Sequence, residues 1–252
     1  MAAEVTWVGH ATVLVRAGAV RLLTDPVLTT RLAHLRRRTA PVDPDVLRTD
    51  VVLVSHAHAD HLHRRSLRRL AAVSPEAVVV VPRGAAPFVA GTGLEHVVEV
   101  EAGQVLEVAG VRLQVTHAEH SARRSRVDSR EAPPVGFVVE HGGRRLWFAG
   151  DTDLYPAMAE IGPVDLTTLP ISGWWRTLGP GHLDEARAAE AVSLVRAARV
   201  LPIHWGTFSP EDLRGGTPQW HVDTGRRFEQ ELSDRGLLDR LVRLEPGQTT
   251  TW

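Results

Sequence analysis

The sequence predicts an α/β protein in which two β-sheets lie face to face with helices on the outside. The chain has 252 residues, of which 43% are hydrophobic, and this is enough to bury a substantial core. Short apolar runs bounded by Gly, Pro or Asp recur along it and are typical of strands. These runs form two β-rich halves that each contain a helical stretch. We expect residues 1–252 to form one domain.

The first half is expected to consist mainly of strands. Residues 5–9, 12–15 and 20–25 indicate a short meander with Gly18 in a turn. Residues 51–55 are an apolar run that predicts a buried strand, and residues 62–73 after it predict a helix. Residues 28–45 are basic and contain Pro, so we expect a loop there, near the functional site. Further strands are expected at residues 77–81, 97–100, 105–108 and 111–116.

The second half repeats this layout. Residues 135–140 and 144–149 predict a hairpin around Gly142 and Gly143. Residues 165–169 and 200–203 predict two more strands, and residues 183–198 an amphipathic helix. We find no low-complexity segment.

The motif His56-Ala57-His58-Ala59-Asp60-His61 lies at the junction of the predicted strand and helix. Three imidazoles and one carboxylate within six residues are hard to explain as packing. Neutral imidazoles and carboxylates are ligands of zinc and similar metals. In an extended loop His56 and His58 point to the same side and can reach one ion, while Asp60 and His61 can face a second. The motif therefore predicts a metal site.

Composition limits the other possibilities. The chain has no Cys, so a transition-metal site must use His and carboxylates. All 29 basic residues are Arg, but the formal net charge is −1, which gives no basic field for a polyanion. We expect no nucleic-acid partner. The sequence shows no signal peptide and no apolar run long enough to span a membrane, so a cytoplasmic location is expected.

The His-x-His-x-Asp-His string resembles the signature of the metallo-β-lactamase superfamily. Four further segments match that family in order and spacing: Leu22-Leu23-Thr24-Asp25-Pro26, Thr116-His117-Ala118-Glu119-His120, Phe148-Ala149-Gly150-Asp151-Thr152-Asp153 and Leu201-Pro202-Ile203-His204-Trp205-Gly206-Thr207. Gly9-His10-Ala11 is similar to the branch that includes ascorbate-6-phosphate lactonase and N-acyl-phosphatidylethanolamine phospholipase D. The resemblance implies a four-layer αββα sandwich.

The resemblance also implies a site for two divalent metal ions, with one ion held by three His and Asp151 as the bridge. Its seven expected ligands are His56, His58, Asp60, His61, His120, Asp151 and His204. Two such ions about 3.5–4 Å apart can share a hydroxide and lower its pKa toward neutrality, which makes it a nucleophile. Zinc is the expected metal, with manganese or iron as alternatives.

The third ligand of the first ion is either His117 or His120. In the resembling branch the motif is Thr, three residues, then His, which favours His120. Asp25 is expected to orient a metal-bound His, and its alternative is a turn-forming residue. The side chain of His10 is either buried and hydrogen-bonded or lines the site, and the sequence leaves this open.

His182 and Asp60 are the expected catalytic residues. His182 precedes the predicted helix in a Gly-rich loop, where the resemblance implies a donor or general acid; the alternative is a helix-start residue. One of the adjacent Trp174 and Trp175 is expected to face the cleft. Arg123, Arg124 and Arg176 are weak candidates for holding a phosphate or carboxylate of the substrate.

We therefore expect a metal-dependent hydrolase that acts through a metal-bridging hydroxide. Phosphodiesters and lactones or other esters are the expected substrates, in a small molecule or a lipid. A homo-oligomer is possible. The alternative is a non-catalytic metal-binding scaffold or regulatory protein of the same fold, which a complete ligand set disfavours.

Overall fold

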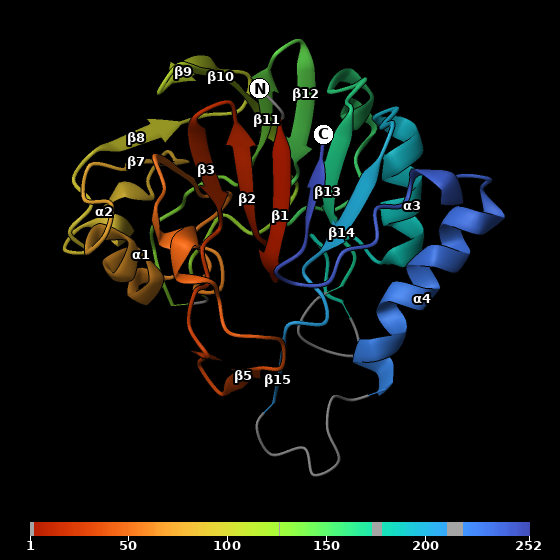
Figure 1. Ribbon diagram of the computed structural model, residues 1–252, viewed down its shortest axis with the longest axis horizontal. Helices are drawn as coiled ribbons and strands as arrows, with labels where there is room; N and C mark the ends of the chain where they lie inside the picture. The colour runs from red at the N-terminus through yellow and green to blue at the C-terminus, as the bar shows by residue number, and fades with distance from the viewer. Residues whose placement is uncertain (1–2, 126, 173–177, 211–218) are drawn as a thin grey trace.

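The computed structural model describes residues 3–125, 127–172, 178–210 and 219–252, and for residues 219–222 it describes the backbone alone. The first large sheet contains seven strands. In this sheet β3, β6, β7 and β8 are parallel, and β16, β1, β2 and β3 are antiparallel (Figure 1). Its strands in spatial order are β16 (Thr249–Thr251), β1 (Glu4–Gly9), β2 (Thr12–Ala17), β3 (Val20–Thr24), β6 (Val51–Leu53), β7 (Val78–Pro82) and β8 (Val97–Val100).

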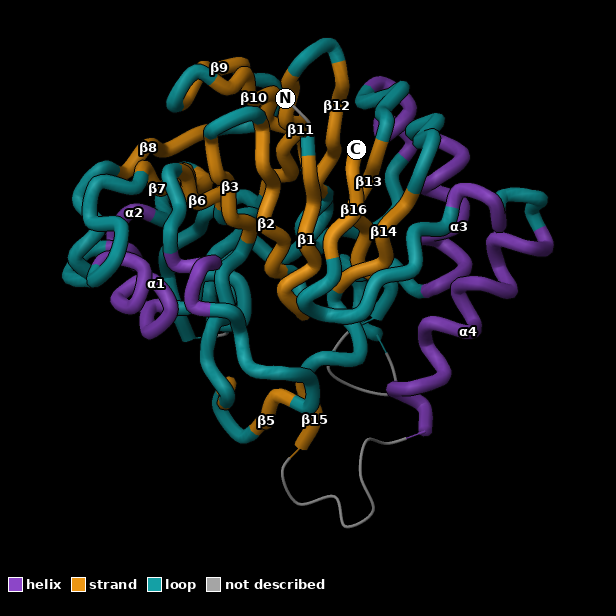
Figure 2. The backbone as a smooth tube through the Cα atoms, viewed as in Figure 1, coloured by secondary structure: helices purple, strands orange, loops and turns teal. Residues whose placement is uncertain are grey.

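The second large sheet has six strands, of which β12, β13 and β14 are parallel. They are β14 (Val200–Ile203), β13 (Leu166–Pro170), β12 (Arg144–Phe148), β11 (Val135–His141), β10 (Val111–His117) and β9 (Val105–Val108). A small third sheet contains β15 (Phe208–Pro210), β5 (Leu35–Arg37) and β4 (Arg31–Leu32). Figure 2 shows β5 and β15 set apart from the large sheets, at one edge of the molecule.

Helices cover the outer faces of the two large sheets. In Figure 1, α1 (Arg64–Ala71) and α2 (Ala86–Val89) lie on the side of the first sheet, and α3 (Glu185–Leu194) and α4 (Gln219–Asp234) on the side of the second. Short 3₁₀ turns span Pro44–Leu47, Pro156–Glu160 and Leu238–Arg240. The predicted four-layer αββα arrangement is confirmed.

Alternation along the strands explains the layers, because successive side chains of a strand point to opposite faces. In the hairpin of β11 and β12, Phe137 and Phe148 are buried in the core between the sheets. Val138 and Trp147 are buried in a second core with α3 and α4. Leu67 of α1 belongs to a third core with the outer face of the first sheet. Both faces of each sheet are therefore covered.

The expected strands of both halves are present, and each of their ends agrees with the prediction or differs from it by one or two residues. The loop expected at residues 28–45 is wrong in part, because it contains the β4–β5 hairpin. The first helix begins at Arg64 rather than at residue 62, because the amides of His61 and Leu62 both donate to the carbonyl of His58 and form a separate turn. The third helix spans only Glu185–Leu194 of the expected residues 183–198, since the Asp184 side chain caps it by accepting the amide of Arg187.

Candidate metal centre

The expected site residues meet where β1, β3, β6, β10, β12 and β14 end. Loops after the carboxyl ends of parallel strands form the usual ligand site of open α/β sheets. His56, Asp60 and His61 follow β6 of the first sheet. Asp151 and His204 follow β12 and β14 of the second. Both sheets therefore contribute to one cluster.

Three imidazoles form the first group of this cluster. His56 Nε2 lies 3.0 Å from His58 Nδ1, and His120 Nε2 lies 3.1 Å from the same His58 atom. Each residue thus offers one ring nitrogen toward a common point, and an ion there would be within reach of all three. The structure brings His120 to His58. His117 instead has an exposed side chain whose ring packs against Tyr155, at 5.0 Å between centroids.

Two carboxylates and two imidazoles form the second group. His61 Nε2 lies 3.4 Å from Asp60 Oδ2 and 3.3 Å from Asp151 Oδ2. His204 Nε2 lies 3.7 Å and 3.4 Å from the same two oxygens, and 3.3 Å from His61 Nε2. A mixed set of nitrogen and hard oxygen donors suits zinc, manganese or iron.

Asp151 lies between the two groups, and its side chain is consistent with a bound cation. The Oδ1 atom is buried and forms no hydrogen bond with any described residue, although a buried carboxylate oxygen without a partner is costly. A cation at this position would satisfy it. Gly150 brings Asp151 close to the loop after β6: its φ is +63°, and a Cβ there would lie 2.4 Å from the Cβ of Ser55. Any larger residue would push the two loops apart.

Asp25 is connected by hydrogen bonds to an imidazole of each group, directly to His61 and through Ser55 to His56. Its buried carboxylate accepts hydrogen bonds from the Ser55 amide at 2.7 Å, from Ser55 Oγ at 2.5 Å and from His61 Nδ1 at 2.6 Å. Ser55 Oγ also lies 3.0 Å from His56 Nδ1, from which it can accept a hydrogen bond. With Nδ1 donating in both rings, Nε2 of His56 and of His61 keeps its lone pair for a metal.

Backbone carbonyls orient two further imidazoles in the same way. His120 Nδ1 donates to the carbonyl of Gly181 at 2.6 Å, and His204 Nδ1 to that of Ser172 at 2.9 Å. Their Nε2 atoms are the ones that face the cluster. The tautomers required for metal binding are thus fixed by hydrogen bonds on the far side of each ring.

Electrostatics keep part of the donor set in metal-binding form without metal. Burial would lower the pKa of His61 and of His204, but the charge of Asp151 outweighs it and raises both. Burial lowers the pKa of His120 to about 4 and holds the pKa of His56 well below its usual range. Burial would raise the pKa of the Asp151 carboxyl, but the neighbouring His204 and His61 outweigh it and hold that pKa well below its usual range. Asp151 is therefore ionised and His56 and His120 are neutral at pH 7, as metal ligation requires.

His10 is buried beside the second group, a position that the sequence could not settle. Its Nε2 lies 3.5 Å from Asp60 Oδ2, and its ring centroid is 4.1 Å from that of His204. The carbonyl of His10 accepts the His204 amide at 3.0 Å and the Trp7 indole at 3.0 Å. Its φ of +53° is rare for a residue other than Gly, and these bonds hold it there.

His182 lies at the mouth of the cluster, in the loop before α3. Its Nε2 is 3.9 Å from Asp151 Oδ2, and its ring stands edge-on to that of His120, at 4.6 Å between centroids. The side chain is 27% exposed, so a substrate can reach it. Arg187 holds this loop by donating to the His182 carbonyl at 2.7 Å and by an ion pair with Asp153. Asp153 and Arg187 were not expected at the site, because neither lies at a sequence spacing from the His motif that is typical of metal ligands.

The arginines expected near the substrate have structural roles in the described residues. Arg124 donates to the carbonyls of Ala57 and Leu62, which fixes the loop that carries the His motif. Arg123 pairs with Glu131 on the surface. Arg176 and the pair Trp174 and Trp175 lie outside the described residues.

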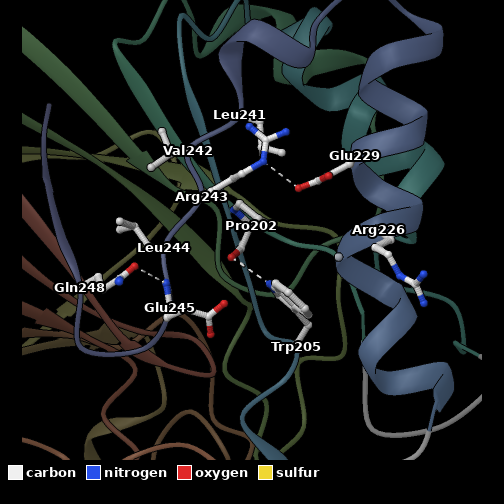
Figure 3. A pocket seen from close by; sticks show the side chains of 11 residues that line it. Pro202, Trp205, Arg226, Glu229, Leu241, Val242, Arg243, Leu244, Glu245 and Gln248 are labelled. Atoms are coloured by element: carbon white, nitrogen blue, oxygen red, sulfur yellow. Dashed lines mark hydrogen bonds and ion pairs between the residues drawn. The ribbon is translucent and has the colours of Figure 1, made fainter.

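Trp205 faces away from the cluster. Its ring stacks on Trp7 at 5.9 Å between centroids, and it lines a hollow of about 310 Å³ between α4 and the segment 241–248. Figure 3 shows the indole pointing into this hollow, beside Pro202. None of the expected metal ligands lines it.

Comparisons with known proteins agree with this geometry. Residues 20–205 match the family model described as the beta-lactamase superfamily domain. A UPF0173 metal-dependent hydrolase of Methanopyrus kandleri is 31% identical over 262 residues, which cover 98% of this chain and 98% of that protein. The chain belongs to the metallo-β-lactamase superfamily. It is accordingly a metal-dependent hydrolase, and membership implies that it binds divalent metal.

Two further proteins show the range of this likeness. The N-acyl-phosphatidylethanolamine-hydrolyzing phospholipase D 1 of Caenorhabditis elegans is 29% identical and matches over 91% of this chain and 70% of its own length. Igni18, a metallohydrolase of Ignicoccus hospitalis, superposes with a TM-score of 0.74 at 24% identity, over 100% of this chain and 99% of its own. This second likeness concerns the fold alone. No helix among the described residues is both long and apolar enough for a membrane span.

Proposed function

We propose that this superfamily member is a dinuclear metal-dependent hydrolase that cleaves a carboxylic ester, a lactone or a phosphodiester. The observation that carries the proposal is the pair of donor groups, each with residues from both sheets, that lie beside the buried carboxylate of Asp151. In this proposal His56, His58 and His120 would hold one ion, Asp60, His61 and His204 would hold the other, and Asp151 would be shared by both. Zinc is our preferred metal, because imidazole and carboxylate donors suit it.

When bound, two divalent ions would lower the pKa of a shared water and polarise the oxygen of the scissile group. The chain's own residues supply the remaining chemistry. In this proposal the Asp60 side chain, which is 16% exposed, accepts a hydrogen bond from the attacking water. His182 can give a proton from Nε2 to the leaving group when both ring nitrogens are protonated, with Nδ1 donating to the carbonyl of Gly179 at 3.3 Å and Nε2 facing the cluster.

The family resemblance and the relatives are compatible with two kinds of substrate, phosphodiesters and carboxylic esters or lactones. They differ in the polarised oxygen, which belongs to a phosphoryl group in the first and to a carbonyl group in the second. The name of the C. elegans relative supports a phosphodiester within a lipid. Arg123 pairs with Glu131 and Arg124 donates to the carbonyl of Ala57, so neither of them faces the donor groups, where it could hold a phosphate. This supports a neutral ester as the substrate. A non-catalytic scaffold is disfavoured, since the donor set is complete and the related proteins are named hydrolases.

Metal content and hydrolysis measured on one preparation test the proposal. We expect about two ions per chain by elemental analysis, and activity toward p-nitrophenyl esters, lactones or bis-p-nitrophenyl phosphate. Asp151→Asn should abolish the activity and lose at least one ion, because it removes the charge shared by both groups. Glu131→Gln, which changes only a surface ion pair, is the control. Full activity in Asp151→Asn, or no metal uptake by the wild-type protein, would refute the proposal.

A further inference from the structure

A hollow of about 370 Å³ opens beside Asp60 and is separate from the hollow of Figure 3. Its wall consists of the β4–β5 hairpin, with Ala59 and Pro210 completing it. Asp60, an expected metal ligand, lines it as well. This volume is within the range of ligand pockets, and a substrate whose scissile group lies at the metal ligands would extend into it.

The pairing of the hairpin makes this wall apolar. Leu32 pairs with Leu35 and Arg31 pairs with Arg36, so the two leucines share one face and the two arginines the other. Leu32 and Leu35 are 6% and 7% exposed and pack with Val27 and Phe208 in a small core, whereas the arginines are exposed. The apolar face is the one that borders the hollow.

Arg37 attaches this wall to the body of the protein. Its guanidinium donates to the carbonyl of Val27 at 2.8 Å and to that of Val8 at 3.1 Å, and it stacks over the ring of Phe208 at 4.9 Å. Arg38 donates to Ser209 Oγ and to the Pro210 carbonyl, at 2.7 Å each. Both cations are therefore used in holding the wall. Among the described residues that line the hollow none is Arg, although the chain has 29 of them.

We propose that this hollow binds an uncharged hydrocarbon group of the substrate, such as the acyl or alkyl chain next to the bond that is cleaved. The inference rests on the proposed function for the position of the scissile group at Asp60. Apolar side chains stabilise buried methylene groups. Among the described residues that line the hollow there is no Arg to compensate a buried phosphate or carboxylate, and the one imidazole, that of His34, is exposed to solvent. The substrate class is then an ester or phosphodiester with an aliphatic substituent, rather than a compact polyanion.

Binding of n-alkyl hydroxamates tests this, from acetohydroxamate to octanohydroxamate. The hydroxamate group binds metal and the alkyl group reports on the hollow. Dissociation constants are measured by calorimetry on zinc-treated protein and on protein treated with a chelator, and metal content is measured on both. We expect affinity to rise by about threefold to fourfold per methylene until the hollow is filled, in both preparations.

Ala33→Asp is the variant that should remove this gain. Ala33 is exposed and has φ +49°, a backbone conformation that Asp tolerates, so the change adds a charge to the wall without disturbing the core. Ala109→Asp is the matched control, because Ala109 is also exposed, with φ +51°, in the turn between β9 and β10. We expect about a tenfold loss for octanohydroxamate in Ala33→Asp, little change for acetohydroxamate, and none for either probe in the control.

Two results would overturn the inference: an affinity that does not change with chain length in the wild-type protein, or equal affinities for octanohydroxamate in Ala33→Asp and Ala109→Asp. If the protein binds two ions and gives either of these results, the further inference is refuted and the proposed function stands. A protein that takes up no metal but still shows the gain per methylene would refute the proposed function and keep the apolar site.

Discussion

Replacing Asp25 with asparagine should weaken metal binding about 10- to 100-fold, because Asp25 holds the Nδ1 side of His61 and, through Ser55, that of His56. The carboxylate has two oxygens and receives three donors: the Ser55 amide on Oδ1, and Ser55 Oγ and His61 Nδ1 on Oδ2. Asparagine offers one oxygen and one NH₂ group. Whichever way the amide is turned, its NH₂ meets a group that was donating.

The consequence reaches the metal through the tautomers. An NH₂ facing His61 favours the ring with its lone pair on Nδ1 and its proton on Nε2, and Nε2 is then closed to a metal. Ser55 Oγ also loses its charged acceptor, which frees it to turn away from His56 Nδ1. Ligands of both groups are affected, so both ions should bind more weakly. The metal-free protein should lose roughly 1.5–3 kcal/mol of unfolding free energy, the usual value of a hydrogen bond to a charged group.

Zinc affinity can be measured by competition with a chromophoric chelator, and the unfolding free energy by denaturant titration of the metal-free protein. Asp50→Asn is a suitable control, because Asp50 is exposed and its Oδ2 accepts one backbone amide, that of Arg21 at 2.8 Å. Cobalt substitution adds a spectroscopic readout of coordination. Unchanged zinc affinity in Asp25→Asn, together with an unchanged cobalt spectrum, would show that Asp25 does not set the tautomers.

Three further predictions concern individual histidines. His120→Ala should lose one metal ion by elemental analysis and His117→Ala none, because only His120 Nε2 faces His58; the reverse result would reassign the ligand. His182→Ala should lower turnover by roughly 10²–10⁴-fold with unchanged metal content, and normal turnover at full occupancy would remove it from the catalytic residues. In the metal-free protein, burial lowers the pKa of His10 to about 3 and that of His120 to about 4. Both rings should therefore stay neutral at pH 5, where a free His is mostly protonated, and imidazole NMR shifts that titrate near pH 6.5 would contradict this.

The strands and the donor set could be predicted from the sequence because their signals are local. The apolar run before His56 and the spacing of the His motif need only a few consecutive residues. The partners of those residues followed from the resemblance of short segments to a family. The geometry places the expected ligands within a few ångströms of one another, and their roles as ligands stay a prediction.

The features that the sequence did not reveal depend on contacts between distant residues. Helix α4 contains Gly225, which disfavours a helix. It is needed there because a Cβ would lie 2.5 Å from the ring of Trp205, twenty residues earlier. β16 is formed by pairing with β1 at the other end of the chain. The β4–β5 hairpin is held by Arg37, which in sequence is one of three consecutive arginines.

The donor groups also join the two halves of the sandwich. His56, His58, Asp60 and His61 extend from the first sheet, and His120, Asp151 and His204 from the second. With metal bound, the edge where these loops meet would be closed by coordination bonds rather than by apolar contact. A ligand that binds only the folded state adds about 2.7 kcal/mol of stability at a free concentration one hundred times its dissociation constant. The supply of metal ions in the surroundings would then govern how firmly the sheets stay together, and metal starvation would act on the lifetime of the protein as well as on its chemistry.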